Sequence, residues 1–197
     1  PKVVVDVSAP NKAGEIRSLA KTTNTSSGLF KANSSAGKGG KIDLTGNSVQ
    51  ISKSEISATG NKMGGKVRIG GEYLGGKELT NTDNKNKQGF VTRFGDQPLI
   101  QNAKQTVVTA DTNIDVSSKE GQGGTTVVWS DQMTDFNGKI NAKGSETRAL
   151  TVDKGGGSIY KSSKDPPNET TKYNSQLVES FADPPPKQMV QLSRNQI

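Results

Sequence analysis

Two pairs of aspartates are the residues whose type and spacing could support catalysis. Asp111 and Asp115 stand four residues apart, and so do Asp131 and Asp135. On a β scaffold, two carboxylates, or a carboxylate and a cation, can flank a sugar and cleave it by acid and base catalysis. In strands that turn corners, this spacing more often places each carboxylate at a solvated bend. We favour the second interpretation, in which these aspartates are structural.

The composition removes most other catalytic and metal-binding chemistries. The sequence contains no cysteine and no histidine, which excludes thiol nucleophiles, Ser-His-Asp triads, zinc fingers and histidine ligation of metals or haem. The Asp- and Asn-rich tracts at 83–86 and 111–115 lack the glycine and terminal glutamate of a calcium-binding EF-hand loop. We therefore predict that the protein is not an enzyme and that it has no cofactor and no metal site.

A stretch of about thirty residues after Gly71 contains the residues that we predict to contact a partner. It interrupts the alternation of apolar residues and exceeds ordinary loop lengths, and loops held by a rigid scaffold often carry binding function. It contains aromatic and basic residues of the kind that interfaces favour, and the predicted contact residues are Tyr73, Lys85, Lys87, Phe90, Arg93 and Phe94. An equally good alternative is that Phe90 and Phe94 fold back over the scaffold as a lid.

A motif that returns in register indicates the scaffold that must position these residues. Gly39-Gly40-Lys41-Ile42-Asp43-Leu44 recurs 25 residues later as Gly64-Gly65-Lys66-Val67-Arg68-Ile69, and Gly123-Gly124 opens a third copy. Ile56 and Ile140 each follow the second glycine of a copy by 16 residues. Units of this length cannot bury an apolar face alone, but stacked neighbours can. The repeat therefore predicts an all-β solenoid with glycine-rich corners.

Composition and pattern suggest how the chain is divided. Only 29% of the residues are apolar and 5% are aromatic, which suits a narrow core better than a thick one. We predict β-helix coils over residues 1–160, with a loop excursion at about 72–105. Residues 161–197 contain five of the eight prolines and are predicted to form an irregular, extended tail or cap. We also expect the repeat register to be lost after Gly157.

The net charge of +7 could attract nucleic acid, an anionic membrane or an acidic glycan. The lysines are spread singly along the chain, however, as is typical of the solvated faces of a β-solenoid, and we predict no nucleic-acid partner. No run approaches the roughly 18 to 20 apolar residues that span a bilayer, so we predict no membrane span. The chain opens inside a strand-like run without a signal peptide, and we therefore expect a fragment or processed piece.

Two further features leave alternatives open. Trp129 follows Val127 and Val128 in a predicted strand, where it could be a surface anchor or could pack in the core or between coils, and we favour packing. The triplets that begin at Asn24, Asn33 and Asn168 fit the pattern of glycosylation acceptors. Such triplets are common by chance in a chain this rich in asparagine, serine and threonine.

The repeat motifs resemble those of large exoproteins that Gram-negative bacteria export by two-partner secretion, a group that includes filamentous haemagglutinin and the high-molecular-weight adhesins. The resemblance lies in residues 64–76, 100–104, 123–130 and 136–144. It implies a right-handed parallel β-helix, export through an outer-membrane partner, and a location outside the cell or on the surface of a Gram-negative bacterium.

The resemblance also implies an origin within the parent protein and a function. The secretion domain of the group carries an Asn-Pro-containing signature that has no counterpart here, so the implied origin is the shaft, and the outer-membrane partner would recognise a missing N-terminal domain. Members of the group bind host molecules. The implied function is binding of a host protein or glycan as an adhesin, with capture of haemopexin for haem acquisition as the alternative. A carbohydrate-active β-helix enzyme, suggested by the aspartate pairs rather than by the resemblance, is the second alternative.

Overall fold

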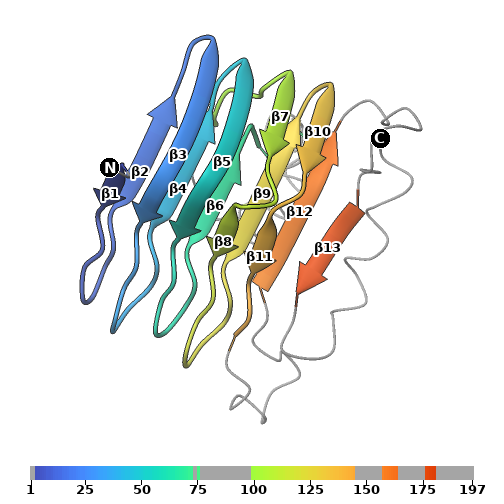
Figure 1. The fold of residues 1–197 in the computed structure, drawn as a ribbon. Helices are drawn as coiled ribbons and strands as arrows, with labels where there is room; N and C mark the ends of the chain where they lie inside the picture. Colours follow the sequence, from blue (N-terminus) through green and yellow to red (C-terminus); the bar gives the residue numbers. More distant parts are fainter. Residues whose placement is uncertain (1–2, 73–74, 76–98, 145–156, 164–175, 181–197) are drawn as a thin grey trace.

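The computed structural model describes residues 3–72, 75, 99–144, 157–163 and 176–180, and its secondary structure is almost entirely β (Figure 1). The strands form two sheets. Sheet 1 consists of β1 (Val4–Asp6), β3 (Thr23–Lys31), β5 (Ser48–Ser57), β7 (Gln105–Val108), β8 (Asn113–Asp115), β10 (Met133–Phe136) and β11 (Lys139–Asn141). Sheet 2 consists of β2 (Glu15–Leu19), β4 (Lys41–Thr45), β6 (Lys66–Ile69), β9 (Thr125–Ser130), β12 (Gly157–Ser163) and β13 (Gln176–Ser180).

The chain alternates between the two sheets as it winds, so successive strands of each sheet pair in parallel. Sheet 1 has the order β1-β3-β5-β7-β10, with β8 pairing to β5 and β11. Sheet 2 has the order β2-β4-β6-β9-β12, and β13 pairs antiparallel at its edge. The result is a β-solenoid of about four turns, as the repeat predicted. Within the described ranges no helix has the length and apolar character needed to cross a bilayer.

The core consists of columns of side chains that stack from one turn to the next. Ile56 pairs in register with Ile114, and Ile114 pairs with Ile140. The two isoleucines linked by the repeat spacing therefore lie in one column, as predicted. Neighbouring strands lie about 4.8 Å apart, so each turn covers the apolar side chains of the next. The largest fully buried apolar side chains are Ile42, Leu44, Val49, Ile51, Ile56, Ile69, Ile114 and Phe136.

The repeated glycines form a corner at which the chain passes from sheet 1 to sheet 2. The N–H groups of Gly40, Gly65 and Gly124 donate to the carbonyl oxygens of Ala32, Ala58 and Val116, each at 2.7 Å. A Cβ on Gly65 would overlap the carbonyl oxygen of Gly40, and a Cβ on Gly124 would overlap that of Gly65. The second glycine of each repeat is therefore required because the backbones of successive turns approach each other closely at this corner.

The parallel pairing of sheet 2 continues beyond the point where we expected the register to be lost. Ser158 pairs in register with Thr125, and the parallel pairing of β12 with β9 extends to Ser163. Gly157 consequently occupies the same column as Gly124. The expectation that the register ends after Gly157 is wrong for this strand. In the sequence, Gly156-Gly157 repeats the glycine pair that precedes β4, β6 and β9, and this copy was not recognised among the neighbouring glycines.

An insertion occupies one corner of the third turn. The links from β4 to β5 and from β9 to β10 contain two residues each, 46–47 and 131–132, whereas residues 70–104 separate β6 from β7. The Ala103 N–H donates to the Gly70 carbonyl oxygen at 2.5 Å. The chain therefore returns to the solenoid next to the residue at which it left. The predicted excursion falls mostly on residues outside the described ranges.

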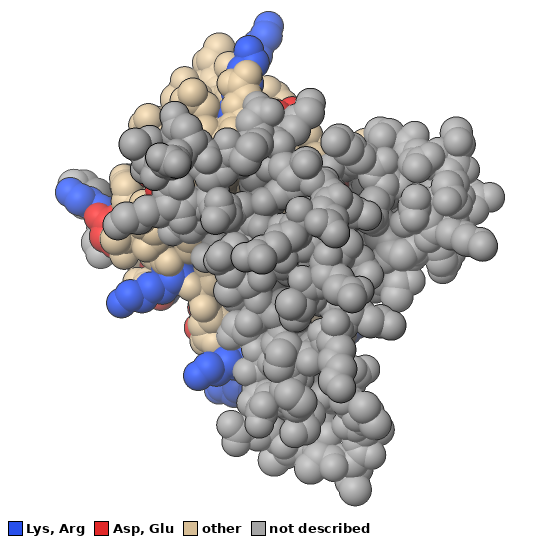
Figure 2. Space-filling view, turned by 90° about the vertical axis from the view of Figure 1, so that its right-hand side faces the viewer, with Lys and Arg blue, Asp and Glu red and all other residues tan. Residues whose placement is uncertain are grey.

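The basic residues of the described surface do not form one continuous patch on the face seen in Figure 2, where Lys and Arg side chains project as separate groups. Some of the charge is locally compensated. The Lys41 ammonium, for example, lies 3.0 Å from the Glu15 carboxylate on the neighbouring strand. This distribution is that of solvated solenoid faces, where exposed charges are expected.

Candidate functional site

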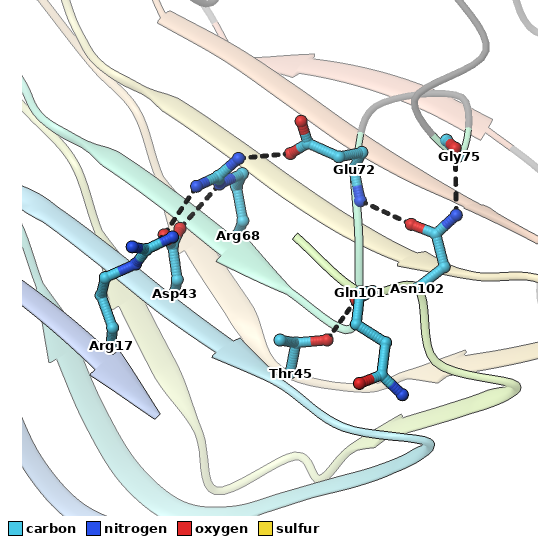
Figure 3. Close-up of polar contacts among 8 residues, drawn as sticks. All are labelled: Arg17, Asp43, Thr45, Arg68, Glu72, Gly75, Gln101 and Asn102. Atoms are coloured by element: carbon cyan, nitrogen blue, oxygen red, sulfur yellow. Dashed lines mark hydrogen bonds and ion pairs between the residues drawn. The ribbon is translucent and has the colours of Figure 1, made fainter. Parts of the chain in front are cut away.

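The candidate site consists of the two ends of the insertion, which lie among the residues that the structure describes. The six residues predicted to contact a partner, Tyr73, Lys85, Lys87, Phe90, Arg93 and Phe94, lie outside the described residues. Residues 70–72, 75 and 99–104, which carry this segment out of the solenoid and back, are here named the insertion base. The insertion base packs on the outer face of sheet 2 (Figure 3).

The exit from the solenoid depends on Gly70. Its φ of 81° lies in the left-handed region, which glycine adopts without the steric cost that a Cβ brings. A Cβ at this position would also overlap the Thr106 hydroxyl and the Trp129 carbonyl oxygen, which are joined by a hydrogen bond of 2.9 Å. The chain can turn out of β6 at this position because the residue is glycine.

A buried network of charged side chains lies beside the insertion base. The register places Asp43 between Arg17 and Arg68 on adjacent strands. Arg68 donates from Nε and Nη2 to the two carboxylate oxygens of Asp43, both at 2.6 Å, and Arg17 Nε lies 3.4 Å from Asp43 Oδ2. The two-pronged geometry is the strong form of an arginine–carboxylate contact. It allows Asp43 and Arg68 to be buried on a face that points away from the core columns.

Glu72 extends this network into the insertion base. Its Oε1 accepts a hydrogen bond of 2.5 Å from Arg68 Nη1, and its side chain is only 1% exposed. Burial raises the pKa of the Glu72 carboxyl above its usual value; the Arg68 cation opposes this effect, and Asp43 adds to it. Burial alone would lower the pKa of Arg68, but the carboxylates of Asp43 and Glu72 outweigh it and raise the pKa. Arg68 therefore stays charged.

Asn102 connects the outgoing and the returning ends of the insertion. Its Oδ1 accepts the Glu72 N–H at 3.0 Å, and its Nδ2 donates to the Gly75 carbonyl oxygen at 3.0 Å and to Asp131 Oδ1 at 3.5 Å. The neighbouring Gln101 carbonyl oxygen accepts a hydrogen bond from the Thr45 hydroxyl of β4. An amide side chain that both accepts and donates can hold two backbone segments together, and Asn102 has this role.

Trp129 packs beneath the insertion base. A Cβ on Gly71 would lie 2.9 Å from Trp129 Cδ1, and a Cβ on Gly75 would lie 3.3 Å from Cζ2. The indole N–H donates to Asp131 Oδ1 at 3.1 Å, and the residue is 5% exposed. The preference for packing over an exposed anchor is therefore confirmed. The ring lies on the outer face of sheet 2, however, and is not part of the main core cluster.

The four aspartates considered for catalysis take part in local hydrogen bonds. Asp131 holds Trp129 and Asn102, as described above. The other three, Asp111, Asp115 and Asp135, accept hydrogen bonds from Lys53 N at 2.9 Å, Ser117 N at 2.8 Å and Asn137 Nδ2 at 2.8 Å, respectively. No group of three or more Asp and Glu residues in the described ranges could hold a metal ion. The clustering with a basic residue that an enzyme would need is not found among these contacts.

The charged network was missed by sequence reasoning, although part of its signal was present. Asp43 and Arg68 occupy equivalent positions in two successive copies of the Gly-Gly-Lys motif, so the repeat alone places opposite charges on adjacent strands. Glu72 and Asn102 carried no such signal, because they approach each other only when the insertion returns to the solenoid.

Comparison with known proteins gives an informative match to a solved structure. No family model matches this chain, and no curated protein matches it in sequence. Among solved structures, the HMW1 secretion domain from Haemophilus influenzae is similar, with a TM-score of 0.58 and 30% sequence identity. The match covers 78% of this chain and 36% of the HMW1 chain, so the present chain spans about a third of the length of that solved chain.

This match bears on the resemblance described above. The matched structure shares with this chain both the β-solenoid fold and appreciable sequence identity. It therefore supports the resemblance to the two-partner-secretion group as a whole, without favouring a particular member. The expected origin in the shaft gains no support from it, because the matched structure is a secretion domain. The chain is thus a β-solenoid similar to the secretion domain of a two-partner-secretion exoprotein.

Proposed function

We propose that this chain is a portion of a secreted or surface-exposed two-partner-secretion exoprotein, and that it binds a host macromolecule as an adhesin through residues of the insertion. The similarity to the HMW1 secretion domain supports the first part. The second part rests on one observation, the replacement of a two-residue corner by residues 70–104 in an otherwise regular solenoid.

The insertion base suits a display function because both ends of the insertion are held firmly. Asn102 joins the outgoing segment to the returning one, and the Arg68–Glu72 contact attaches the outgoing segment to sheet 2. Fixing the ends of a loop reduces the conformational entropy that binding must remove. Charged groups buried beside the loop are consistent with a constrained attachment.

The test is binding of the full 197-residue chain to epithelial cells, measured by flow cytometry. The triple variant Phe90→Ala, Arg93→Ala and Phe94→Ala is expected to weaken binding by about tenfold or more, because aromatic and arginine residues dominate interface energies. The control variant Thr25→Ala, Gln50→Ala and Lys139→Ala changes exposed side chains of sheet 1 and should bind like the parent chain. Equal binding by both variants, or no binding by the parent chain, would contradict the proposal.

Haemopexin capture is the alternative host target and is tested by the same proteins. A pull-down with purified haemopexin distinguishes the two, because an adhesin would bind the cells and leave haemopexin in solution. Haem need not be ligated in either case, since an exoprotein can seize the carrier protein itself. Retention of haemopexin by the parent chain and the control variant, with loss in the triple variant, would replace the adhesin proposal with the haemopexin one.

Recognition by the outer-membrane secretion partner is a second candidate function, and the match to a secretion domain favours it. In this case the chain itself, rather than a missing domain, would contact the partner. The purified partner, immobilised in detergent, should then bind the chain, and the chain should compete with the parent exoprotein. Absence of both binding and competition would leave export recognition to another part of the parent protein.

A further inference from the structure

Glu72 is the least satisfied charged group of the insertion base. Its Oε1 is bonded to Arg68, but its Oε2 is buried and finds no hydrogen-bond partner among the described residues. A buried oxygen of an ionised carboxylate without a donor is costly, because water would otherwise hydrate it. By contrast, both oxygens of Asp43 accept hydrogen bonds from Arg68. The network therefore accommodates an ionised Asp43 much better than an ionised Glu72.

The charges around Glu72 come from several elements. Arg68 on β6 faces it directly, and Asp43 on β4 lies on the other side of that guanidinium. Arg17 on β2 contacts Asp43, and Asp131, after β9, is reached through Asn102. Lys41 and Lys66 occupy the adjacent outward positions of β4 and β6. The attraction to Arg68 does not compensate for burial, so the pKa of Glu72 stays raised.

The backbone of Glu72 is also the point at which the outgoing segment is attached. Its N–H donates to Asn102 Oδ1 at 3.0 Å, and its carbonyl oxygen accepts the Gly75 N–H at 3.0 Å. Detaching this segment would break its contacts with Asn102 and with Arg68 of sheet 2, and it would expose the carboxyl to water in the same event. In water the pKa of the carboxyl would return to its usual range.

We propose that Glu72 makes the insertion base a pH-sensitive clasp, in which a proton on its carboxyl strengthens the attachment of residues 70–72 and Gly75 to the outer face of sheet 2. The sign follows from linkage. The attached state has the higher pKa, so it binds the proton more tightly than the detached state. The stabilisation is fully present at pH values below the pKa that the Glu72 carboxyl has in the detached state. It is lost as the pH rises through the pKa that the carboxyl has in the attached state. This inference does not depend on what the insertion binds.

The test is hydrogen exchange of the full chain between about pH 5 and about pH 7.5, expressed as protection relative to the intrinsic exchange rate. The informative amides are those of Glu72, Gly75 and Ala103, which donate within the insertion base. One linked proton changes protection by at most about tenfold per pH unit. Protection of these amides should rise on acidification, while that of Gly65 in the glycine corner stays constant.

Two variants separate Glu72 from the other carboxylates. Glu72→Gln keeps the shape but cannot titrate, so the pH dependence should disappear. Glu55→Gln changes an exposed glutamate of β5 and should leave the pH dependence of the protection intact. Persistence of the dependence in Glu72→Gln, or protection that falls on acidification, would overturn the proposal.

A direct titration keeps the test valid should Glu72→Gln not fold. The carboxyl carbons of the unmodified chain can be followed by NMR as the pH is varied. The midpoint of Glu72 is expected above the usual range of a glutamate carboxyl. A midpoint within or below that range would overturn the proposal regardless of the variants.

Discussion

Lys66 shows how a repeat can place a side chain in an unfavourable environment. It pairs in register with Lys41, the equivalent residue of the preceding Gly-Gly-Lys copy. Burial lowers the pKa of Lys66 to about 8, and Lys41, Arg68 and Lys38 add repulsion. Within the described part of the chain, no carboxylate lies within ion-pair distance of its ammonium. The charged form of Lys66 is therefore destabilising in the folded state.

Replacing Lys66 with Met should stabilise the protein at neutral pH. Because the pKa of Lys66 in the folded state lies below its usual value of 10.5, the folded state disfavours the proton. The penalty is present below about pH 8 and fades as pH rises toward the pKa of the unfolded state. We expect a gain of about 1 kcal/mol at neutral pH, after allowing for partial exposure of the side chain. Urea unfolding at about pH 7 and about pH 10 measures it.

The gain in the Lys66→Met variant should shrink at the higher pH, because the wild-type side chain is then neutral in the fold. Lys139→Met, at an exposed position of β11, serves as the matched control and should change the unfolding free energy little at either pH. A variant at position 66 that is less stable than the wild type at neutral pH would contradict the prediction.

At the scale of elements, the glycine corner determines how closely successive turns can approach. Its N–H groups close the corner within each turn, while the absent Cβ leaves room for the carbonyl oxygen of the previous turn. The parallel ladder of sheet 2, which begins after the corner, keeps its register from β2 to β12. The corner and the ladder therefore depend on each other, since widening one corner would shift two neighbouring strands.

Gly65→Ala should destabilise the solenoid strongly. The new methyl group would meet the Gly40 carbonyl oxygen, and backbone on both sides would have to move, which we expect to cost roughly 3 kcal/mol. Gly46→Ala is the matched control, because its Cβ would lie 3.2 Å from the nearest atoms, and it should cost less than about 1 kcal/mol. Thermal unfolding followed by circular dichroism compares them. Similar melting temperatures for the two variants would refute a close-approach requirement at position 65.

At the scale of the whole molecule, β1 and β2 form one end of the two sheets (Figure 1). The apolar side chains there are unusually exposed, with Val4 at 57% and Leu19 at 55%. Edge strands present unpaired backbone groups that can pair with another chain. This end is therefore the part of the described surface at which we expect copies of the chain to associate.

Val4→Lys together with Leu19→Lys should reduce self-association, because charged side chains discourage pairing at a strand edge. Both positions are exposed, so the free energy of unfolding should change by less than about 0.5 kcal/mol for each substitution. Sedimentation velocity across a concentration series measures the association. Thr25→Lys, on the exposed face of β3, adds a charge away from the edge. An equal reduction by this control would mean that net charge, rather than the edge, is responsible.

The repeating parts of the structure were the most predictable ones. The repeat spacing placed Ile56 and Ile140 in one column, and it paired Asp43 with Arg68 although the pair was not recognised. The environment of Trp129 was only partly predictable. A strand pattern shows which residues alternate, but it does not show that a second layer will cover the outer face of a sheet.

The sequence by itself determined the β-solenoid, because stacking requires the same residue types at the same position of every turn and so leaves a periodic record. Only the tertiary structure decided the contacts between the insertion base and sheet 2. Glu72, Asn102 and Trp129 are separated in the chain by up to 57 positions and follow no period. They meet because the insertion leaves and re-enters at one corner, and burial there, rather than residue type, sets the pKa of Glu72.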